Sequence, residues 1–209
     1  MVYHQYTMPS PRYGRLTPQR REQILEVARR HFAAGAEAAS YNQIIADAGI
    51  SKTTAYLYFD GKADLFAEVW RDLLTRLTEV MGPWRPAGSS RGFWRRLGTT
   101  SDRLRRHLVE HPDDLALLGQ AVVVPEAATL DRWFADLVDD GVGLGIIRTA
   151  VPRPLLVAAT IVVFRVADQH VLAAMLRGET GDVEPGLRLL RALWGASPTR
   201  TATRSSQRS

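Results

Sequence analysis

Residues 40–65, SYNQIIADAGISKTTAYLYFDGKADL, contain two short helical patterns separated by one glycine. Ser40 predicts the start of the first helix, because its hydroxyl can accept a hydrogen bond from an amide of the first turn. Gly49 predicts the end of that helix, since glycine tolerates the left-handed conformation that a sharp reversal needs. Ser51 predicts the cap of the second helix. The stretch therefore indicates a helix, a tight turn and a second helix.

The apolar residues of this stretch fall on one side of each predicted helix. Ile44, Ile45 and Ala48 form such a stripe on the first helix. Ala55 and Phe59, four residues apart, form one on the second. Two helices joined in this way are typical of a helix-turn-helix, whose second helix enters the major groove of DNA. The side chains expected at the DNA are those of Ser40, Tyr41, Ser51, Lys52, Thr53, Thr54, Tyr56, Tyr58 and Lys62.

The outer side chains of the second helix have the chemistry that a DNA backbone requires. Lys52 and Lys62, the only two lysines of the chain, can neutralise phosphates. The hydroxyls of Tyr56 and Tyr58 can donate to phosphate oxygens and fix the register. Thr53 lies at the leading end, where a short side chain can meet a base edge or a thymine methyl. The alternative is that both tyrosines are ordinary half-buried aromatic residues.

Residues 21–70 resemble the DNA-binding domain of the TetR (tetracycline repressor) family of transcriptional regulators. The run AGISKTTAYLYF, residues 48–59, matches a family pattern at most of its positions. Other residues that carry the resemblance are Ile24, Leu25, Ala28, Phe32, Gly35, Ser40, Ile45, Ala46, Lys62 and Leu65. The departures from the pattern are Ile44, Ile50, Thr53, Ala55 and Gly61.

This resemblance implies an all-α fold of about nine helices. The first three helices would form the DNA-binding domain, and the rest would form a helical domain for ligand binding and dimerisation. The periodicity of the remaining sequence is also helical throughout, without strand alternation. Helices are predicted at 17–34, 62–81, 92–110, 113–124, 125–140, 152–175 and 184–194, in addition to the two in the opening stretch.

The chain divides into four parts by composition. They are a flexible basic arm (1–16), the helix-turn-helix domain (17–64), the helical ligand-binding and dimerisation domain (65–195) and a disordered Ser/Thr/Arg tail (196–209). Within the second domain, a glycine-rich link is expected at 141–145. Thr17 predicts the cap of the first long helix, with Pro18 at its first position.

Composition bounds the class of protein. The 209 residues carry a net charge of +5, and basic residues in the arm predict salt-dependent attraction to a duplex. The absence of cysteine excludes disulfides and cysteine-ligated zinc. The N-terminus has no apolar signal segment, and the longest apolar run, 155–164, is about half of the roughly 20 residues that span a bilayer. A cytoplasmic protein without membrane contact is expected.

The helix at 152–175 is apolar on nearly all sides, which predicts that it is covered on more than one side. It is either a central core helix or, with the last helix, half of a four-helix dimer interface. A single helix-turn-helix contacts few base pairs, so a two-fold homodimer on a palindromic duplex is expected. The residues predicted at the dimer interface are Val163, Leu172, Leu187, Leu190 and Trp194.

The family resemblance also implies a small-molecule pocket in the second domain. Apolar helices with a few polar groups suit such a cavity. The candidate pocket residues are Trp84, Trp94, Trp133, Phe134, Phe164, Arg165 and Asp168. With Gln169, Arg165 and Asp168 make a polar stripe on an apolar helix. The alternative is an Arg–Asp pair at the edge of the dimer interface.

One motif resembles a metal site. His107, Glu110 and His111 fit the H-x-x-E-H pattern of inverted zinc proteases, with the two histidines on one helical face. Pro112 follows directly and three arginines lie close in sequence, so neither a metal nor a cofactor is expected. The sequence thus predicts a non-enzymatic, ligand-responsive repressor that is released from its operator by an unknown small molecule. The alternative is a metal-dependent hydrolase or ligand-sequestering protein with a structural helix-turn-helix.

Overall fold

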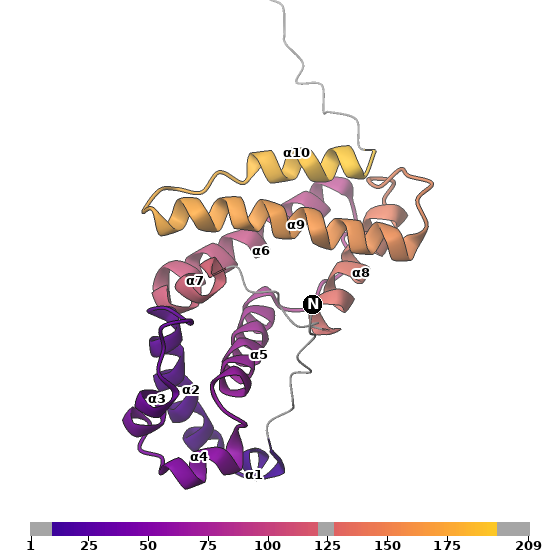
Figure 1. The fold of residues 1–209 in the computed structure, drawn as a ribbon. Coiled ribbons are helices and arrows are strands. Elements are labelled where there is room, and N and C mark those ends of the chain that lie inside the picture. Colours follow the sequence, from indigo (N-terminus) through magenta and orange to yellow (C-terminus); the bar gives the residue numbers. More distant parts are fainter. Residues whose placement is uncertain (1–9, 121–127, 196–209) are drawn as a thin grey trace, which may run out of the picture.

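The computed structural model describes residues 10–120 and 128–195, and in this part of the chain all regular secondary structure is helical (Figure 1). The all-α fold predicted from the sequence is confirmed. The helices are α1 (Pro11–Gly14), α2 (Pro18–Ala33), α3 (Tyr41–Asp47), α4 (Lys52–Tyr58), α5 (Lys62–Met81), α6 (Ser90–Glu110), α7 (Pro112–Gly119), α8 (Ala128–Gly143), α9 (Arg153–Leu176) and α10 (Glu184–Leu193).

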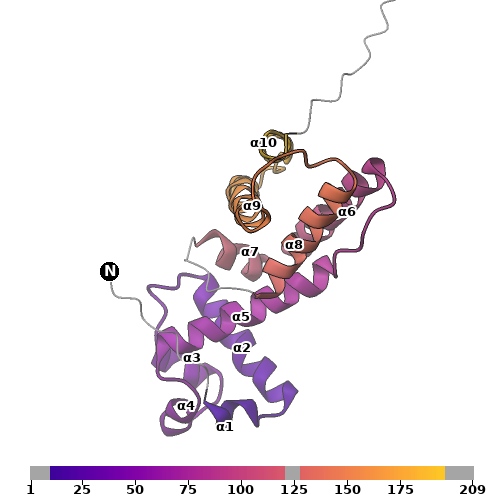
Figure 2. The same ribbon diagram turned by 90° about the vertical axis from the view of Figure 1, so that its right-hand side faces the viewer.

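The helices are arranged around α5, which links two ends of the molecule. Figures 1 and 2 show α1 to α4 gathered at one end, with α9 and α10 side by side at the other. The first turns of α5 pack against α2 and contribute to the core of the helix-turn-helix, and α5 also packs against α6. The short α7 lies between the two ends, where it contacts both α2 and α9.

Two apolar cores correspond to these two ends. The first is built around Phe32, Ile44 and Phe59, and it includes Leu117 of α7. The second contains Trp194 together with buried residues of α6, α8, α9 and α10. Because α7 contributes Leu117 to the first core, a movement of α7 would change the packing of α2 and of the helix-turn-helix.

The segment before α2 is folded from Ser10 onward, which corrects the prediction of a flexible arm through residue 16. Pro11–Gly14 forms one helical turn, and Ser10 caps it by accepting a hydrogen bond from the Tyr13 amide. Tyr13 is only 3% exposed because its ring packs against α4 and Phe59. Residues 1–9 lie outside the described part, as does the predicted tail at 196–209.

Two predicted boundaries in the second domain also differ from the sequence expectation. The helix predicted at 113–124 ends at Gly119 in α7, and residues 121–127 lie outside the described part. The glycine-rich link begins later than predicted, because α8 continues to Gly143. Gly141 is buried beside Ile147, and a Cβ there would lie 2.8 Å from the Ile147 Cδ1 atom. This glycine therefore serves close packing rather than a turn.

By length and composition, α9 could cross a membrane, and of the helices in the described ranges it alone passes that test. One helix of this kind is weak evidence for a membrane segment, since core helices have similar sequences. Few residues of its most apolar stretch are buried within the chain. The helix therefore leaves apolar surface that another molecule can cover.

Candidate nucleic-acid interface

The two helices of the helix-turn-helix begin at the predicted caps. The Ser40 hydroxyl accepts a hydrogen bond from the Gln43 amide at the start of α3. The Ser51 hydroxyl accepts one of 3.1 Å from the Thr54 amide at the start of α4. Gly49, between them, has a φ of 63°, a conformation that glycine adopts without a side-chain clash. The helix-turn-helix predicted from the sequence is confirmed.

Arg20 of α2 holds the turn between α3 and α4. Its guanidinium donates to the Ala48 carbonyl at 3.2 Å and to the Gly49 carbonyl at 2.9 Å. These carbonyls lie at the end of α3, where no later helical amide can reach them. Sequence analysis assigned no contact of this kind to Arg20. Its role depends on a contact between residues 28 and 29 positions apart, which no local pattern reveals.

A second set of contacts ties α3 to α2 at the helix end. The Asp47 carboxylate lies 2.8 Å from His31 Nε2 and accepts a hydrogen bond of the same length from the Gln43 side chain. These partners lower the pKa of Asp47, with the His31 contact as the largest cause. The recognition helix α4 therefore projects from a turn that is bonded to α2 at two points.

The outer face of α4, formed by Lys52, Thr53, Tyr56 and Leu57, is exposed. Tyr56 is 53% exposed, and its ring lies 5.7 Å from that of Tyr41. Burial, followed by the effect of Tyr56, raises the pKa of Tyr41 to about 12. The outer face thus offers an ammonium group, hydroxyl groups and one aliphatic side chain to a partner.

Two hydroxyl residues of the predicted set are turned toward the protein. The Thr54 hydroxyl lies 2.7 Å from that of Ser51, so both belong to the cap of α4. Tyr58 is half-buried, and its ring centroid lies 6.2 Å from that of Tyr13. The position of Tyr58 fits the sequence alternative of a packed aromatic more closely than that of a fully exposed phosphate contact.

Lys62 is bonded differently from the sequence expectation of a free phosphate contact. Its ammonium donates to the carbonyls of Ala36, Glu37 and Ala39 at 3.1, 2.7 and 3.1 Å. A lysine has three N–H groups, so all of them are used by the loop between α2 and α3. In this structure Lys62 is therefore a structural residue that joins this loop to α5, and Lys52 is the lysine that faces outward.

Gly61, which departs from the TetR family pattern, lies directly before the first residue of α5. Gly61 has a φ of 116° and no side chain that could cap the helix. Asp64 instead accepts a hydrogen bond of 3.2 Å from the Asp60 amide, reaching back from the first turn. Burial raises the pKa of Asp64 above its ordinary value, because its carboxylate is largely removed from water.

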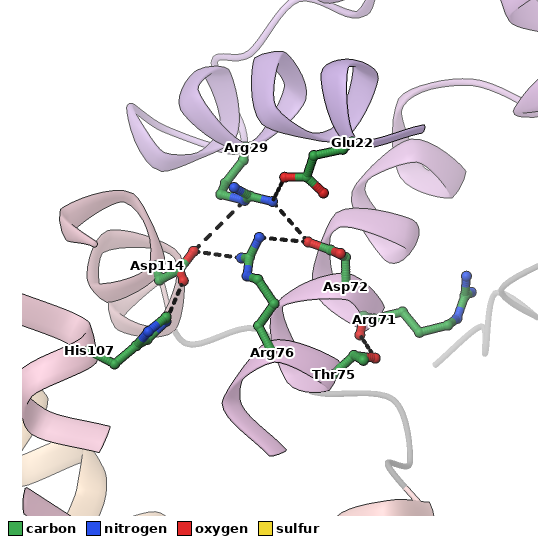
Figure 3. A network of polar contacts seen from close by, with 8 residues as sticks. All are labelled: Glu22, Arg29, Arg71, Asp72, Thr75, Arg76, His107 and Asp114. Atoms are coloured by element: carbon green, nitrogen blue, oxygen red, sulfur yellow. Dashed lines mark hydrogen bonds and ion pairs between the residues drawn. The ribbon is translucent and has the colours of Figure 1, made fainter. Parts of the chain in front are cut away.

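A network of charged side chains joins the helix-turn-helix to the second domain (Figure 3). Asp114 of α7, which is 2% exposed, accepts a hydrogen bond of 2.7 Å from Arg76 of α5. Its carboxylate also lies 3.8 Å from Arg29 of α2 and 2.9 Å from the ring of His107 on α6. Asp72 completes the network by accepting from both arginines. Four helices therefore meet at one buried carboxylate.

Gln120, directly after α7, makes a second link between the domains. Its side-chain amide donates to the carbonyls of Phe32 and Ala33 at 2.8 and 3.1 Å. Its carbonyl oxygen accepts a hydrogen bond of 2.9 Å from the Ala36 amide. The end of α2 is thus capped by a residue of the second domain, which sequence analysis did not identify.

The aromatic residues proposed as pocket walls mostly belong to the second core. Trp84, Trp133 and Phe134 are buried, and the rings of the two tryptophans lie 5.3 Å apart. The Trp133 indole donates to the Gly82 carbonyl, and the Trp84 indole donates to Asp140. Phe164 and Trp94 are half-buried and pack against Phe134 and Trp194, respectively. These contacts are those of core residues.

The polar stripe on α9 is exposed in the protomer. Arg165, Asp168 and Gln169 all face solvent, and within the described ranges Arg165 and Asp168 do not pair with each other. A shallow hollow elsewhere in the domain is lined by Trp84, Pro86, Asp136, Asp139, Asp140, Gly143 and Leu144. Of the predicted pocket residues, Trp84 lines this hollow.

Two of the predicted dimer residues are turned into the protomer core, which corrects that assignment. Leu190 and Trp194 are 1% and 0% exposed, and the Trp194 indole donates to the Thr160 hydroxyl at 3.1 Å. Val163, Leu172 and Leu187 are half-buried. The aliphatic row that α9 presents to solvent consists of Leu155, Val162, Val166 and Leu176, with Leu189 exposed on α10.

The H-x-x-E-H motif does not assemble a metal site. The His107 ring is bonded to Asp114, and its centroid lies 4.2 Å from that of His111. In the part of the chain that the structure describes, no three His, Cys, Asp or Glu side chains are grouped so that they could hold a metal ion. The alternative of a metal-dependent hydrolase has no geometric support at this motif.

A family model for bacterial regulatory proteins of the tetR family matches residues 24–69. The resemblance to the TetR family is confirmed for this segment. It covers α3 and α4 in full, together with most of α2 and part of α5. Among curated proteins, none matches this sequence. The family match supports a DNA-binding transcriptional regulator.

Solved structures similar to this chain are also TetR family regulators. One from Chloroflexus aurantiacus J-10-FL has 23% sequence identity and a TM-score of 0.50, covering 90% of this chain and 93% of its own. Another, from Streptomyces coelicolor, has 21% identity and a TM-score of 0.44, covering 88% and 91%. The first likeness supports a TetR-like fold over most of the chain.

Proposed function

We propose that this protein is a ligand-responsive transcriptional repressor that binds a palindromic duplex as a homodimer. The observation that carries the proposal is the outer face of α4. Lys52, Thr53 and Tyr56 are exposed on a short helix whose other side is fixed by Ala55 and Phe59. An exposed ammonium can contact a phosphate, and a threonine near the start of the helix can meet base edges in the major groove.

The aliphatic row of α9 supports a two-fold dimer. Leu155, Val162, Val166 and Leu176 are all exposed although they are large and apolar. Their separations of 7, 4 and 10 residues keep them on one side of the helix. An exposed apolar row of this kind marks a contact with another protein or with a membrane, and of the two we propose a protein interface. Pairing α9 and α10 with a second copy would cover the row and place two α4 helices on one duplex.

The proposed ligand response depends on α7, which contacts the helix-turn-helix core and α9 at the same time. A small molecule that prefers one arrangement of α6 to α9 would shift α7. The shift would reach α2 through Asp114 and Gln120. A coupling free energy of about 1–3 kcal/mol is typical of such responses and corresponds to a change of roughly 5- to 150-fold in DNA affinity.

The proposal is tested by selecting bound duplexes from a random pool with the full chain. We expect enrichment of an inverted repeat, because two α4 helices related by two-fold symmetry read the same half-site in opposite orientations. A Lys52→Ala,Tyr56→Ala variant is the matched control and should enrich no sequence. Failure of the parent chain to enrich any duplex would overturn the proposal.

A further inference from the structure

The C-terminal end of the recognition helix is closed by a residue from outside the helix-turn-helix. The last carbonyls of an α-helix have no partner within that helix. Here the Ser10 amide donates to the Tyr58 carbonyl at 3.1 Å, and the Ser10 hydroxyl donates to the Leu57 carbonyl. The same hydroxyl accepts from the Tyr13 amide. One serine thus caps the end of α4 and the beginning of α1.

Tyr13 fixes α1 against this end of α4. Its ring centroid lies 4.8 Å from that of Phe59 and 6.2 Å from that of Tyr58. Burial raises the pKa of Tyr13 to about 12, and its hydroxyl has no hydrogen-bond partner among the residues that the structure describes. The residue is therefore held by ring packing rather than by its hydroxyl.

The inward position of Tyr13 leaves the other side of α1 facing solvent. Arg12 and Arg15 are both exposed, and neither forms an ion pair within the described ranges. Figures 1 and 2 show α1 beside α4 at the end of the molecule that is farthest from α9 and α10. Two exposed arginines therefore belong to a helix that packs against α4, at the same end of the molecule.

We infer that α1 is part of the DNA-binding surface, with two distinct roles that rest on the function proposed above. Arg12 and Arg15 contact phosphates beside the half-site that α4 reads. Ser10 and Tyr13 are positioning residues, which hold the C-terminal end of α4 at a fixed angle to the duplex. Arginine suits the first role because its planar, permanently charged group bonds phosphate oxygens in pairs.

The phosphate contacts are tested by the salt dependence of binding to a selected duplex. Each phosphate contact that is lost lowers the slope of log K against log salt by about 0.9. The Arg12→Gln,Arg15→Gln variant removes up to four contacts from a dimer, so its slope should fall by about 3 to 4. The matched control is Arg91→Gln,Arg95→Gln, which removes the same charge from exposed positions on α6.

The outcomes separate this inference from the function on which it rests. A lower slope for the α1 variant, with a slope close to that of the parent chain for the α6 control, supports it. Equal slopes for the α1 variant and the parent chain would overturn the role of the two arginines and leave the proposed function intact. If the parent chain binds no duplex at all, the proposed function fails first.

The positioning role is tested at Tyr13 by a readout other than stability. Tyr13→Ala removes the ring contact, so affinity for the selected duplex should fall by about tenfold more than affinity for a random duplex. Tyr13→Phe keeps the ring and should retain the selectivity of the parent chain. Thermal unfolding measured in parallel identifies loss of folding. A folded Tyr13→Ala protein with unchanged selectivity would overturn the positioning role.

Discussion

At the α4 end of the molecule, side chains bond to the backbone of neighbouring helices, whereas at the α9–α10 end aliphatic side chains face solvent. Arg20, Ser10 and Lys62 all reach carbonyls on other segments and complete the first region within one chain. The second region is held by packing around Trp194 but leaves Val162 and its neighbours on α9 uncovered.

This difference indicates that one protomer can form the recognition surface alone, whereas its aliphatic row requires a partner. The α4 end is held together by contacts within one chain, so its recognition surface is expected to exist in a monomer. The α9–α10 end becomes complete only when its exposed row is covered. The proposed dimer therefore sets the distance between two recognition helices that each protomer already forms. Within a protomer, the network at Asp114 joins the two regions (Figure 3).

The largest expected effect comes from placing a charge in the aliphatic row. Val162→Arg puts a guanidinium where two copies of α9 are proposed to pack, so sedimentation should show a monomer. Affinity for a selected palindrome should then fall by about 100-fold or more, since only one half-site remains bound. The control is Val109→Arg, at an exposed valine near the end of α6. Dimerisation of the Val162→Arg protein would contradict the assignment of this row.

The next effect tests the junction between the two regions. Asp114→Asn removes the buried charge that faces Arg76, Arg29 and His107, so Asp72 is left as the carboxylate shared by the two largely buried arginines. The free energy of unfolding should fall by about 2–4 kcal/mol in chemical denaturation. Asp102→Asn, which alters an exposed pair of 3.5 Å with Arg105, should cost below about 0.5 kcal/mol. Similar losses for both variants would show that the junction contributes no special stability.

The two lysines provide a matched test of the α4 end. Lys62→Met leaves three carbonyls without their donor, so the free energy of unfolding should fall by about 1–3 kcal/mol. Lys52→Met removes an exposed charge and should change stability by less than about 0.5 kcal/mol. The salt dependence of DNA binding should decrease mainly for Lys52→Met. The reverse pattern would restore the sequence interpretation of Lys62 as a phosphate contact.

The smallest effect concerns pH. Since burial raises the pKa of Asp64, its ionised form destabilises the folded state above the folded pKa, and this cost disappears as the pH falls toward the ordinary value for aspartate. Asp64→Asn keeps an oxygen that can accept from the Asp60 amide. It should raise the unfolding temperature slightly at pH 7, with a smaller gain at pH 4. A larger gain at pH 4 than at pH 7 would contradict this sign.

Local features of the α4 end and of the connecting helix α5 could be predicted from the sequence. Thr17, Ser40 and Ser51 cap the helices that they were expected to cap, because a cap depends on residues within one turn. The helix at 62–81 also begins and ends as predicted. Apolar periodicity and capping residues therefore set most of the helix boundaries.

Contacts between distant segments could not be predicted in the same way. The partners of Lys62 lie 23 to 26 residues earlier, and those of Gln120 lie more than 80 residues earlier. Trp194 was assigned to the dimer interface, but periodicity within the last helix does not show whether its apolar side meets a second copy or the core of its own protomer. The same ambiguity applied to the aromatic residues proposed as pocket walls.

The most direct test of the account is to repeat the random-pool selection with a Thr53→Asn variant. Thr53 is exposed at the leading end of α4, where a change from a hydroxyl to an amide favours different base edges. The account predicts an inverted repeat whose base preference changes at the same position in both half-sites. An unchanged consensus, or a change in only one half-site, would contradict recognition by two symmetric α4 helices.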